Sequence, residues 1–253
     1  MIGIGLNLWR RGGSGIAYPG HNLVVFDGTN DYMTIAANPF GVAPEYFSAA
    51  FYVQPESLAA STSHNLLWAN AQMLIRITHT SGIPSCVLQN VDGAPFNLTA
   101  GTQAVIAGQP NLIQIAARSA TSYADSYAEI WVNGVSSQAV AGSPGQTGGF
   151  LFNTYSQWGL FATYAGAVKF GNAGGPAGGS AGLAWITAGA TAAHYITQGT
   201  YDFNNIRDLG VDGSAPGVTP IVFYGGEQTA ANWNAGTNQG SGSDWTMVGD
   251  GVV

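Results

Sequence analysis

Charged side chains are scarce in this chain of 253 residues: Asp, Glu, Lys and Arg make up 8% of it, against about 25% in average globular proteins. Only six residues are Lys or Arg, and the formal net charge is −7. Binding to nucleic-acid phosphates requires clustered basic side chains, so the composition excludes a nucleic-acid-binding protein. The same shortage argues against adhesion to an anionic membrane surface.

Cysteine is almost absent, because Cys86 is the only one. A single cysteine excludes an internal disulfide framework, and its surroundings, PSCVLQNV, favour a small core residue over a reactive thiol. No apolar run approaches the ~18 residues of a membrane span, so we expect no membrane insertion. The start, MIGIGLNLWRR, has its basic pair after the apolar stretch, the reverse of a secretory signal. We therefore expect synthesis in the host cytoplasm without a signal peptide.

Glycine, in contrast, is abundant at 37 residues. With so few Lys and Glu, small and uncharged polar residues must cover the surface, which favours strands and turns over helices. Short alternating runs such as YAEIWV recur between turn signals, of which Asn133-Gly134 is the strongest. Further turns are predicted at Asp92-Gly93 and Ala69-Asn70, and a short helix only within ATAAHYITQG. The pattern predicts an all-β fold, an antiparallel sandwich or barrel.

Four segments occur in an order that resembles a known family. They are LVVFDGTNDYMTI, FSAAFYVQP, NLIQIAARSATSYADSYAEIWVNGV and GLAWITAGATAAHYIT, and together they are similar to the concanavalin-A-like or laminin-G-like jelly roll. The resemblance implies a two-sheet jelly-roll sandwich at residues 21–200, preceded by an N-terminal arm at 1–20 and completed by a C-terminal segment at 201–253. We expect PIVFYGG and DWTMVGD to pair within this sandwich, because isolated terminal strands leave backbone groups unpaired.

The two ends of the chain resemble bacteriophage virion proteins. MIGIGLNLWRRGG is similar to the start of many of them, and the segment from YDFNNIRDLG onward resembles a C-terminal segment of phage proteins with this jelly roll. These likenesses imply a non-enzymatic structural protein of a tailed-phage virion, such as a capsid- or tail-attached decoration, spike or fibre component on the virion surface. The implied partners are other virion proteins, further copies of this chain and host surface polysaccharide. A cellular carbohydrate-binding lectin is the alternative.

The stretch FDGTNDYMTI gathers Asp27, Asn30 and Asp31 at one corner of a chain that has few charges. Asx side chains in turns hydrogen-bond nearby backbone N–H groups, which is the structural interpretation. Some laminin-G relatives bind calcium on this face, so a calcium site is the alternative. Calcium takes about six to eight oxygen ligands, more than three residues supply unaided. No other cofactor is expected.

The sequence offers no convincing catalytic set. A glucanase of this fold requires paired carboxylates in a Glu-x-Asp-x-x-Glu pattern, and Glu45 and Glu129 each lack an acidic neighbour at that spacing. GGSAG at 178–182 matches the Gly-x-Ser-x-Gly of hydrolases, but we expect it in a glycine-rich loop, and no acid lies between Ser180 and the last histidine, His194. We therefore expect no enzymatic activity, with a glucanase-type glycoside hydrolase as the less favoured alternative.

Aromatic side chains beside expected loops are candidate carbohydrate contacts, since their faces pack against sugar C–H surfaces. Most aromatic residues in a sandwich fill the core instead, and we expect Trp131 and Trp185 there. The candidates are Tyr123, Tyr155, Trp158 and Trp233.

The N-terminal arm combines apolar and basic residues with glycines that prevent a core of its own. We expect it to attach the protein to the virion by adding a strand to a partner's sheet, with its arginines paired to carboxylates. Folding back as an edge strand of its own sandwich is the alternative. The attachment residues are Ile2, Ile4, Leu6, Trp9, Arg10 and Arg11.

Overall fold

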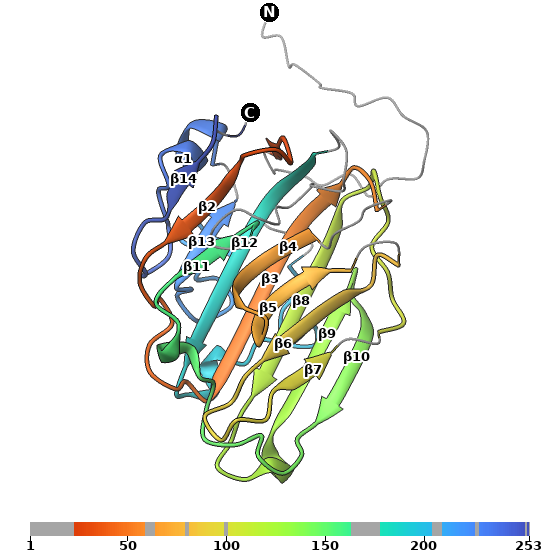
Figure 1. Ribbon diagram of the computed structural model, residues 1–253, viewed down its shortest axis with the longest axis vertical. Helices are drawn as coiled ribbons and strands as arrows, with labels where there is room; N and C mark the ends of the chain where they lie inside the picture. Colours follow the sequence, from red (N-terminus) through yellow and green to blue (C-terminus); the bar gives the residue numbers. More distant parts are fainter. Residues whose placement is uncertain are drawn as a thin grey trace, which may run out of the picture.

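The computed structural model describes residues 23–58, 64–78, 81–98, 101–162, 178–203, 209–225, 228–250 and 252. These residues form two sheets packed face to face (Figure 1). Sheet A has the order β1 (Val24–Phe26), β12 (Gly179–Gly189), β3 (Tyr46–Pro55), β8 (Asn111–Arg118), β9 (Tyr127–Val132), β10 (Val135–Ala141), and β13 (Val222–Gly225) also pairs with β12. Sheet B has the order β14 (Thr246–Val248), β2 (Tyr32–Ile35), β11 (Trp158–Leu160), β4 (His64–Asn70), β5 (Met73–Ile77), β6 (Pro84–Leu88), β7 (Phe96–Leu98).

All pairings between these strands are antiparallel, so the predicted all-β, two-sheet jelly-roll sandwich is confirmed. Helix is limited, within the described residues, to α1 (Ala230–Asn234) and the 3-10 turns η1 (Tyr123–Asp125), η2 (Phe152–Thr154) and η3 (Ala192–His194). The short helix expected within ATAAHYITQG corresponds to η3. No described helix is long and apolar enough to cross a membrane.

The strongest turn signal forms the predicted hairpin. Asn133 and Gly134 connect β9 to β10 with φ values of 51° and 80°, a pair of left-handed residues that two-residue hairpins require. Asp92-Gly93 forms the expected turn after β6, and Gly93 has a φ of 95°. The turn expected at Ala69-Asn70 is wrong by two residues: β4 continues to Asn70, whose Oδ1 accepts a hydrogen bond from Gln72 N at 2.7 Å.

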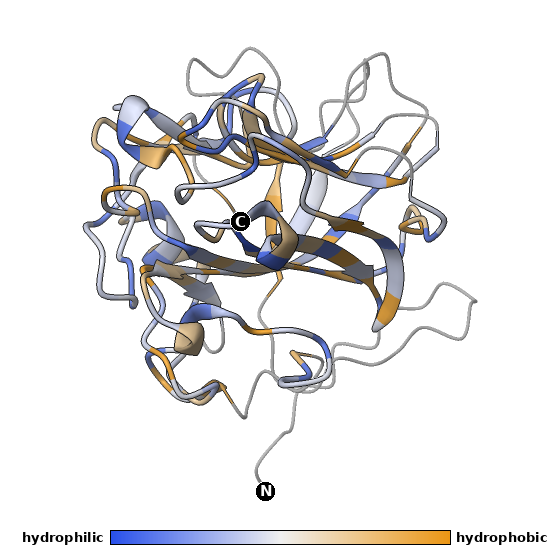
Figure 2. Ribbon diagram, turned by 90° about the horizontal axis from the view of Figure 1, so that it is seen from below, coloured by the Kyte–Doolittle hydropathy of each residue, from blue (hydrophilic) through white to orange (hydrophobic). Residues whose placement is uncertain are grey.

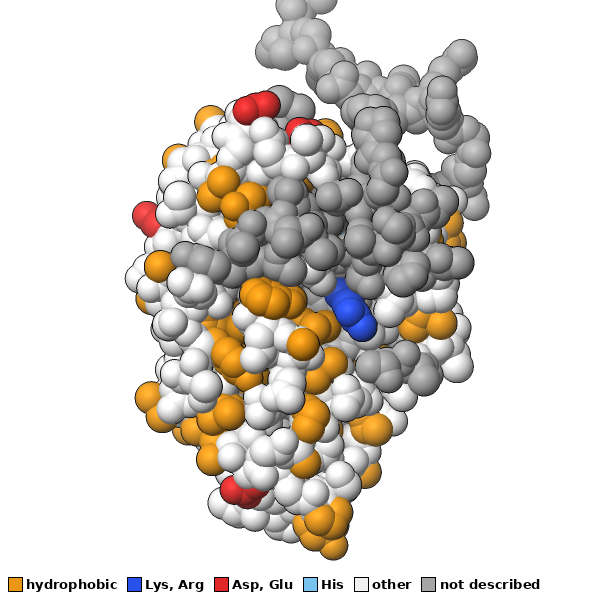
Figure 3. Space-filling model, viewed as in Figure 1, with side chains coloured by type: hydrophobic (Ala, Val, Ile, Leu, Met, Phe, Trp, Pro, Cys, Tyr) orange, Lys and Arg blue, Asp and Glu red, His pale blue; other side chains and the backbone are white. Residues whose placement is uncertain are grey.

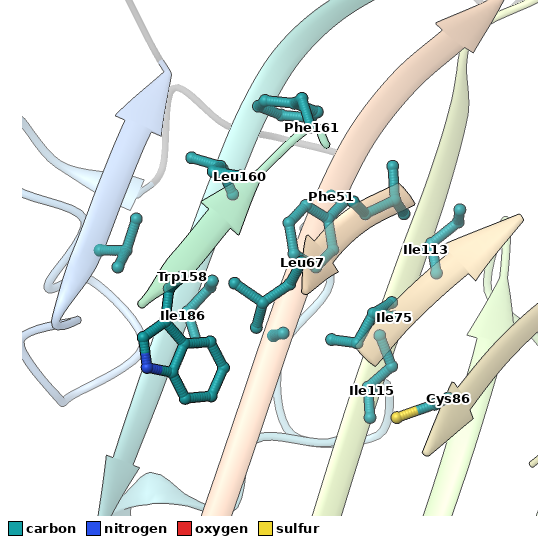
Figure 4. Close-up of a cluster of buried hydrophobic side chains, with 14 of the residues drawn as sticks. Phe51, Leu67, Ile75, Cys86, Ile113, Ile115, Trp158, Leu160, Phe161 and Ile186 are labelled. Atoms are coloured by element: carbon teal, nitrogen blue, oxygen red, sulfur yellow. The ribbon is translucent and has the colours of Figure 1, made fainter. Parts of the chain in front are cut away.

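The main core lies between the sheets (Figure 4). Phe51 of β3 and Ile113 of β8 face Leu67 of β4 and are fully or almost fully buried. Removing each such side chain from water stabilises the fold by roughly 1.5–3 kcal/mol. Cys86 is buried in the same core, and burial raises the pKa of its thiol, so its expected role as a core residue is confirmed.

A second, smaller core lies on the outer face of sheet A. The segment between β12 and β13 covers part of this face, where Phe203 packs against Trp185 with ring centroids 5.0 Å apart. The indole N–H of Trp185 donates to Gly213 O at 2.9 Å, which fixes the segment to the sheet. Figure 2 shows this irregular layer beside the two sheets. The covering segment leaves other side chains of the same face partly exposed, and these include the candidate site described below.

Both C-terminal strands pair within the sandwich, as predicted. β13 pairs with β12 of sheet A, and β14 pairs with β2 of sheet B. Between them, Gly236 has a φ of 70°, and a Cβ at this position would lie 1.7 Å from Trp245 O. The chain therefore requires glycine here to bring α1 and β14 together. Trp131 and Trp185 are buried, at 7% and 0% exposure, as expected.

Candidate functional site

The Asp27 corner is an Asx turn. Asp27 Oδ1 accepts hydrogen bonds from the backbone N–H groups of Thr29, Asn30 and Asp31 at 2.7, 3.0 and 3.4 Å. Burial raises the pKa of Asp27, but these hydrogen bonds outweigh it, so the pKa lies below its ordinary value. No group of three His, Cys, Asp or Glu side chains in the described residues is placed to hold a metal ion. Asp27 thus makes the backbone hydrogen bonds that the structural interpretation predicts.

Two of the four candidate sugar contacts are core residues, so the prediction is wrong for Trp158 and Trp233. Both side chains are fully buried. Trp158 packs edge-on against Phe40 at 4.8 Å, and Trp233 packs against Phe161 at 5.9 Å. Trp158 lies on a central strand of sheet B, and α1 directs Trp233 inward, so neither ring presents a face to a ligand.

The other two candidates lie nearer the surface. Tyr155 packs edge-on against Trp158 with ring centroids 6.1 Å apart, and its hydroxyl donates to Gln89. Tyr155 is therefore a partly buried residue that packs against the main core. Tyr123 lies in η1, in the loop between β8 and β9, and is 47% exposed. Tyr123 is therefore the only one of the four whose ring is largely open.

The remaining sequence candidates are not part of a site that the structure describes. The arm residues Ile2, Ile4, Leu6, Trp9, Arg10 and Arg11 lie outside the described residues. Ser180 was expected in a glycine-rich loop, which is wrong: it lies within β12, paired with Val25 of β1 and Gln54 of β3. Pairing on both sides holds Gly179–Ala181 extended, so the strand-to-helix turn of a nucleophile elbow is not formed.

A different group of side chains comes together on the outer face of sheet A. Tyr46 pairs with Arg118 across β3 and β8, and Arg118 pairs with Tyr127 across β8 and β9. Directly paired residues project from the same face of a sheet, so the three side chains form a row. The Arg118 guanidinium lies 5.4 Å from the centroid of the Tyr46 ring, and its Nε donates to Glu45 Oε1 at 2.8 Å.

Glu129 and Tyr195 complete this group, which we call the tyrosine patch (Tyr46, Arg118, Tyr127, Glu129 and Tyr195). Glu129 follows Tyr127 by two positions and therefore shares its face. Its carboxylate accepts the Tyr127 hydroxyl at 2.8 Å and the Ser136 hydroxyl at 2.5 Å. Tyr195, which follows η3, packs edge-on against Tyr46 with centroids 6.3 Å apart.

Burial and the charge of Glu129 favour the protonated forms of Tyr127 and Tyr195. Burial, the hydrogen bond to Glu129 and the charge of Glu129 raise the pKa of Tyr127 to about 12. Burial and then Glu129 raise the pKa of Tyr195 to about 12, against an opposing effect of Arg118. On the face of sheet B that Figure 3 shows, few charged side chains are visible, in keeping with the low charge content of the chain.

The patch has hydrogen-bonding groups that the described residues do not use. Its five side chains are all partly exposed, and no hydrogen bond among the described residues engages the hydroxyl of Tyr46 or of Tyr195. Toward the edge strand β10, small exposed residues continue the surface, with Ala141 paired to Tyr127 and Ala139 paired to Glu129. The result is a surface of aromatic rings, donors and acceptors that can contact both the apolar and the hydroxyl faces of a sugar.

The sequence pattern alone does not identify the tyrosine patch, although it indicates the position of three of its members. Alternation in NLIQIAAR and YAEIWV places Arg118, Tyr127 and Glu129 on their strands' polar face, and the intervening loop predicts that the two strands pair. Tyr46 and Tyr195 come from distant segments, so only the tertiary structure could add them.

Comparisons with known proteins concern the fold. No protein-family model and no curated protein sequence matches this chain. Among solved structures, a candidate carbohydrate-binding protein from Bacteroides ovatus is similar with a TM-score of 0.57 at 14% identity. The alignment covers 92% of this chain and 59% of that protein, so the chain spans less than two thirds of its length.

Two further structures are more distantly similar. A heptameric SAP-like pentraxin from Limulus polyphemus has a TM-score of 0.43 at 10% identity, with 94% of this chain and 90% of that one covered. Domains LG4-5 of the mouse laminin α1 chain also have a TM-score of 0.43, at 11% identity, with 72% and 47% covered. At these identities the likeness concerns the fold alone.

Proposed function

We propose that this chain is a non-enzymatic carbohydrate-binding jelly-roll module, carried as a structural component of a tailed-phage virion. The observation that carries the binding role is the tyrosine patch, in which Tyr46, Arg118 and Tyr127 stand in one row across three strands. Sugars are recognised by aromatic rings against their C–H faces and by directional hydrogen bonds to their hydroxyls. The patch supplies both on a rigid sheet.

Each part of the patch has a defined task in this proposal. The rings of Tyr46 and Tyr195, set at 62° to one another, provide two walls for a pyranose ring. Their hydroxyls and the Arg118 guanidinium donate hydrogen bonds, and Glu129 accepts them. A carboxylate has about four lone-pair sites, and the Tyr127 and Ser136 hydroxyls occupy two of those on Glu129.

The virion part of the proposal has different support. It rests on the resemblance of the two ends of the chain to phage virion proteins, and on an uncharged polar surface suited to many weak contacts in a symmetric assembly. In this setting the protein is a decoration, spike or fibre component that binds host surface polysaccharide. A cellular lectin with the same patch is the alternative, and an inventory of proteins in purified virions distinguishes the two.

The patch is better suited to binding than to glycoside hydrolysis. Glu45 is engaged by Arg118 at 2.8 Å, and Glu129 is held by two hydroxyl donors. A retaining hydrolase requires one carboxyl group as a proton donor and the other as a nucleophile at the same bond. Neither side chain is presented as a free proton donor here.

Calorimetric titration with neutral oligosaccharides of glucose, galactose, mannose and N-acetylglucosamine tests the binding role. We expect saturable binding of at least one of them, weakened about tenfold or more by Tyr46→Ala and by Tyr195→Ala. Trp68→Ala is the matched control, because Trp68 is a half-buried aromatic residue on the other sheet. Loss of binding in the control alone, or no binding of any oligosaccharide, contradicts the proposal.

A further inference from the structure

The charges around the tyrosine patch are unevenly balanced. Arg118 is the only basic side chain in the patch, and its Nε is already paired with Glu45. Two more carboxylates face the same region: Glu129, whose hydrogen-bond donors are the neutral Tyr127 and Ser136 hydroxyls, and Asp125 in η1, whose charge acts on Arg118. Three carboxylates therefore stand against one guanidinium.

The histidine on the covering segment does not restore the balance. His194 precedes Tyr195, and its Nδ1 lies 2.6 Å from the Thr187 hydroxyl. Burial lowers the pKa of His194, which disfavours the charged form of the ring. The whole chain is acidic as well, with a net charge of −7, which adds a long-range field of the same sign.

We infer that the patch selects sugars by charge: it binds neutral sugars and, more tightly, sugars with a free amine, and it excludes glycans that carry carboxylate or sulfate groups. This inference rests on the proposed carbohydrate-binding function. An acidic glycan would bring its charge beside Glu129 and Asp125, and the charge of Arg118, the one guanidinium of the patch, is already paired with Glu45. Like charges in contact disfavour binding. An ammonium group has the opposite effect.

Glu129 is the residue that sets this preference. Two of its lone-pair sites remain open after the Tyr127 and Ser136 hydroxyls are bound, so it can accept hydrogen bonds from an ammonium group. Charge-assisted hydrogen bonds of this kind are about twice as strong as neutral ones. Glu45 attracts an ammonium group less strongly, because its charge is already paired with that of Arg118.

The experiment compares three oligosaccharides of equal length: glucosamine oligomers, N-acetylglucosamine oligomers and galacturonate oligomers. Binding is measured by calorimetry at about 20 mM and 150 mM salt, since screening weakens charge effects at the higher concentration. We expect the amine to bind most tightly, the acetylated sugar next, and the uronate not at all. Glu129→Gln should reduce the ratio of amine to acetylated affinity by about two- to fivefold.

Asp250→Asn is the control, because it removes the same charge from an exposed position beyond β14. It should leave the ratio unchanged. Binding of the uronate as tightly as the neutral sugar overturns the inference while the carbohydrate-binding function stands. If Glu129→Gln and Asp250→Asn reduce the ratio of amine to acetylated affinity equally, the amine is attracted unspecifically to an acidic protein, and the inference is overturned. Amine binding that survives Tyr195→Ala has the same meaning. If no oligosaccharide binds, the proposed function fails and the inference fails with it.

Discussion

Ser48 holds the two residues on either side of Tyr195: its hydroxyl donates to His194 O at 2.8 Å and accepts from Ile196 N at 2.8 Å. Ser48 lies in β3, two positions after Tyr46, so a single buried side chain joins the covering segment to the strand that carries the other ring of the patch. The geometry of Tyr46 and Tyr195 therefore depends on this contact.

Ser48→Ala should lower the free energy of unfolding by about 1–3 kcal/mol, because it leaves the buried N–H of Ile196 and the partly buried carbonyl of His194 without their partner. It should also weaken oligosaccharide binding, since Tyr195 loses its support. Denaturant unfolding and calorimetry measure the two effects. Thr34→Ala, a change on β2 of the other sheet, is the control. A Ser48→Ala protein with unchanged stability and unchanged binding contradicts this role.

Alkaline pH should destabilise the protein through the tyrosines of the patch. The pKa values of Tyr127 and Tyr195 are each raised to about 12 in the folded state, whereas a free tyrosine titrates near 10. A tyrosine whose pKa is raised by folding stabilises the fold at every pH below its pKa in the unfolded state. This contribution is lost as the pH rises from about 10 through 12, because the unfolded chain releases its proton first. The melting temperature should be level near pH 9 and fall above pH 10.

Glu129→Gln tests the cause of this shift. Removing the negative charge should lower the pKa of both tyrosines, so the phenolate absorbance should develop at lower pH than in the unmodified protein. Glu56→Gln is the control, because Glu56 follows the opposite end of β3 from Tyr46. An identical titration curve for Glu129→Gln would show that burial alone raises the two pKa values.

Local sequence signals predicted the fold better than the site. Asn133-Gly134 specifies its hairpin through two left-handed residues, and the alternation in β8 and β9 identifies the faces that pack into the main core. Trp158 and Trp233 were misassigned because a loop-adjacent aromatic residue can face either way, and only packing against Phe40 or Phe161 decides.

The tyrosine patch illustrates the limit of such signals. It combines β3, β8 and β9 with a residue after η3. β3 and β8 are neighbours in sheet A, but β4, β5, β6 and β7 of sheet B lie between them in the sequence. Residues so far apart in sequence leave no periodic pattern that links them. Ser180 was misplaced for a related reason: its glycine-rich surroundings suggest a loop, but β1 and β3 pair with it on both sides.

Asp27→Ala should destabilise the protein by about 1–2 kcal/mol, because three backbone N–H groups lose their shared acceptor. Asp27→Asn is the matched control, since its amide oxygen can still accept those bonds, and it should cost less. Thermal unfolding with calcium and with a chelator should give the same melting temperature for the unmodified protein. A rise with calcium that Asp27→Asn abolishes would instead support the calcium alternative.

We expect no glycosidase or esterase activity. Ser180 lies in a paired strand, and Glu45 and Glu129 are each engaged by other side chains. Incubation with a polysaccharide that the protein binds should release no reducing ends, and a chromogenic ester should not be hydrolysed. Ser180→Ala should be indistinguishable from the unmodified protein in both assays. Turnover that disappears with Glu129→Gln would assign the patch to catalysis.

The N-terminal arm should be dispensable for folding and required for attachment to the particle. The strands that the structure describes all lie between Val24 and Val248, so we expect both sheets to form without residues 1–20. A protein that begins at residue 21 should therefore keep its melting temperature and its oligosaccharide binding. It should fail to appear on virions, because the apolar residues of the arm and its two arginines, Arg10 and Arg11, would add a strand and charge pairs to a partner protein.

A second variant separates attachment through charge from attachment through the added strand. Replacing Arg10 and Arg11 by Gln keeps the apolar alternation and removes two of the six basic residues of the chain. Since charge pairs contribute specificity and association rate more than affinity, this variant should still attach, but more slowly and with less dependence on salt. A sharp loss of thermal stability on truncation would favour the arm as an edge strand of its own sandwich. Incorporation of the truncated protein into particles would exclude the arm as the anchor.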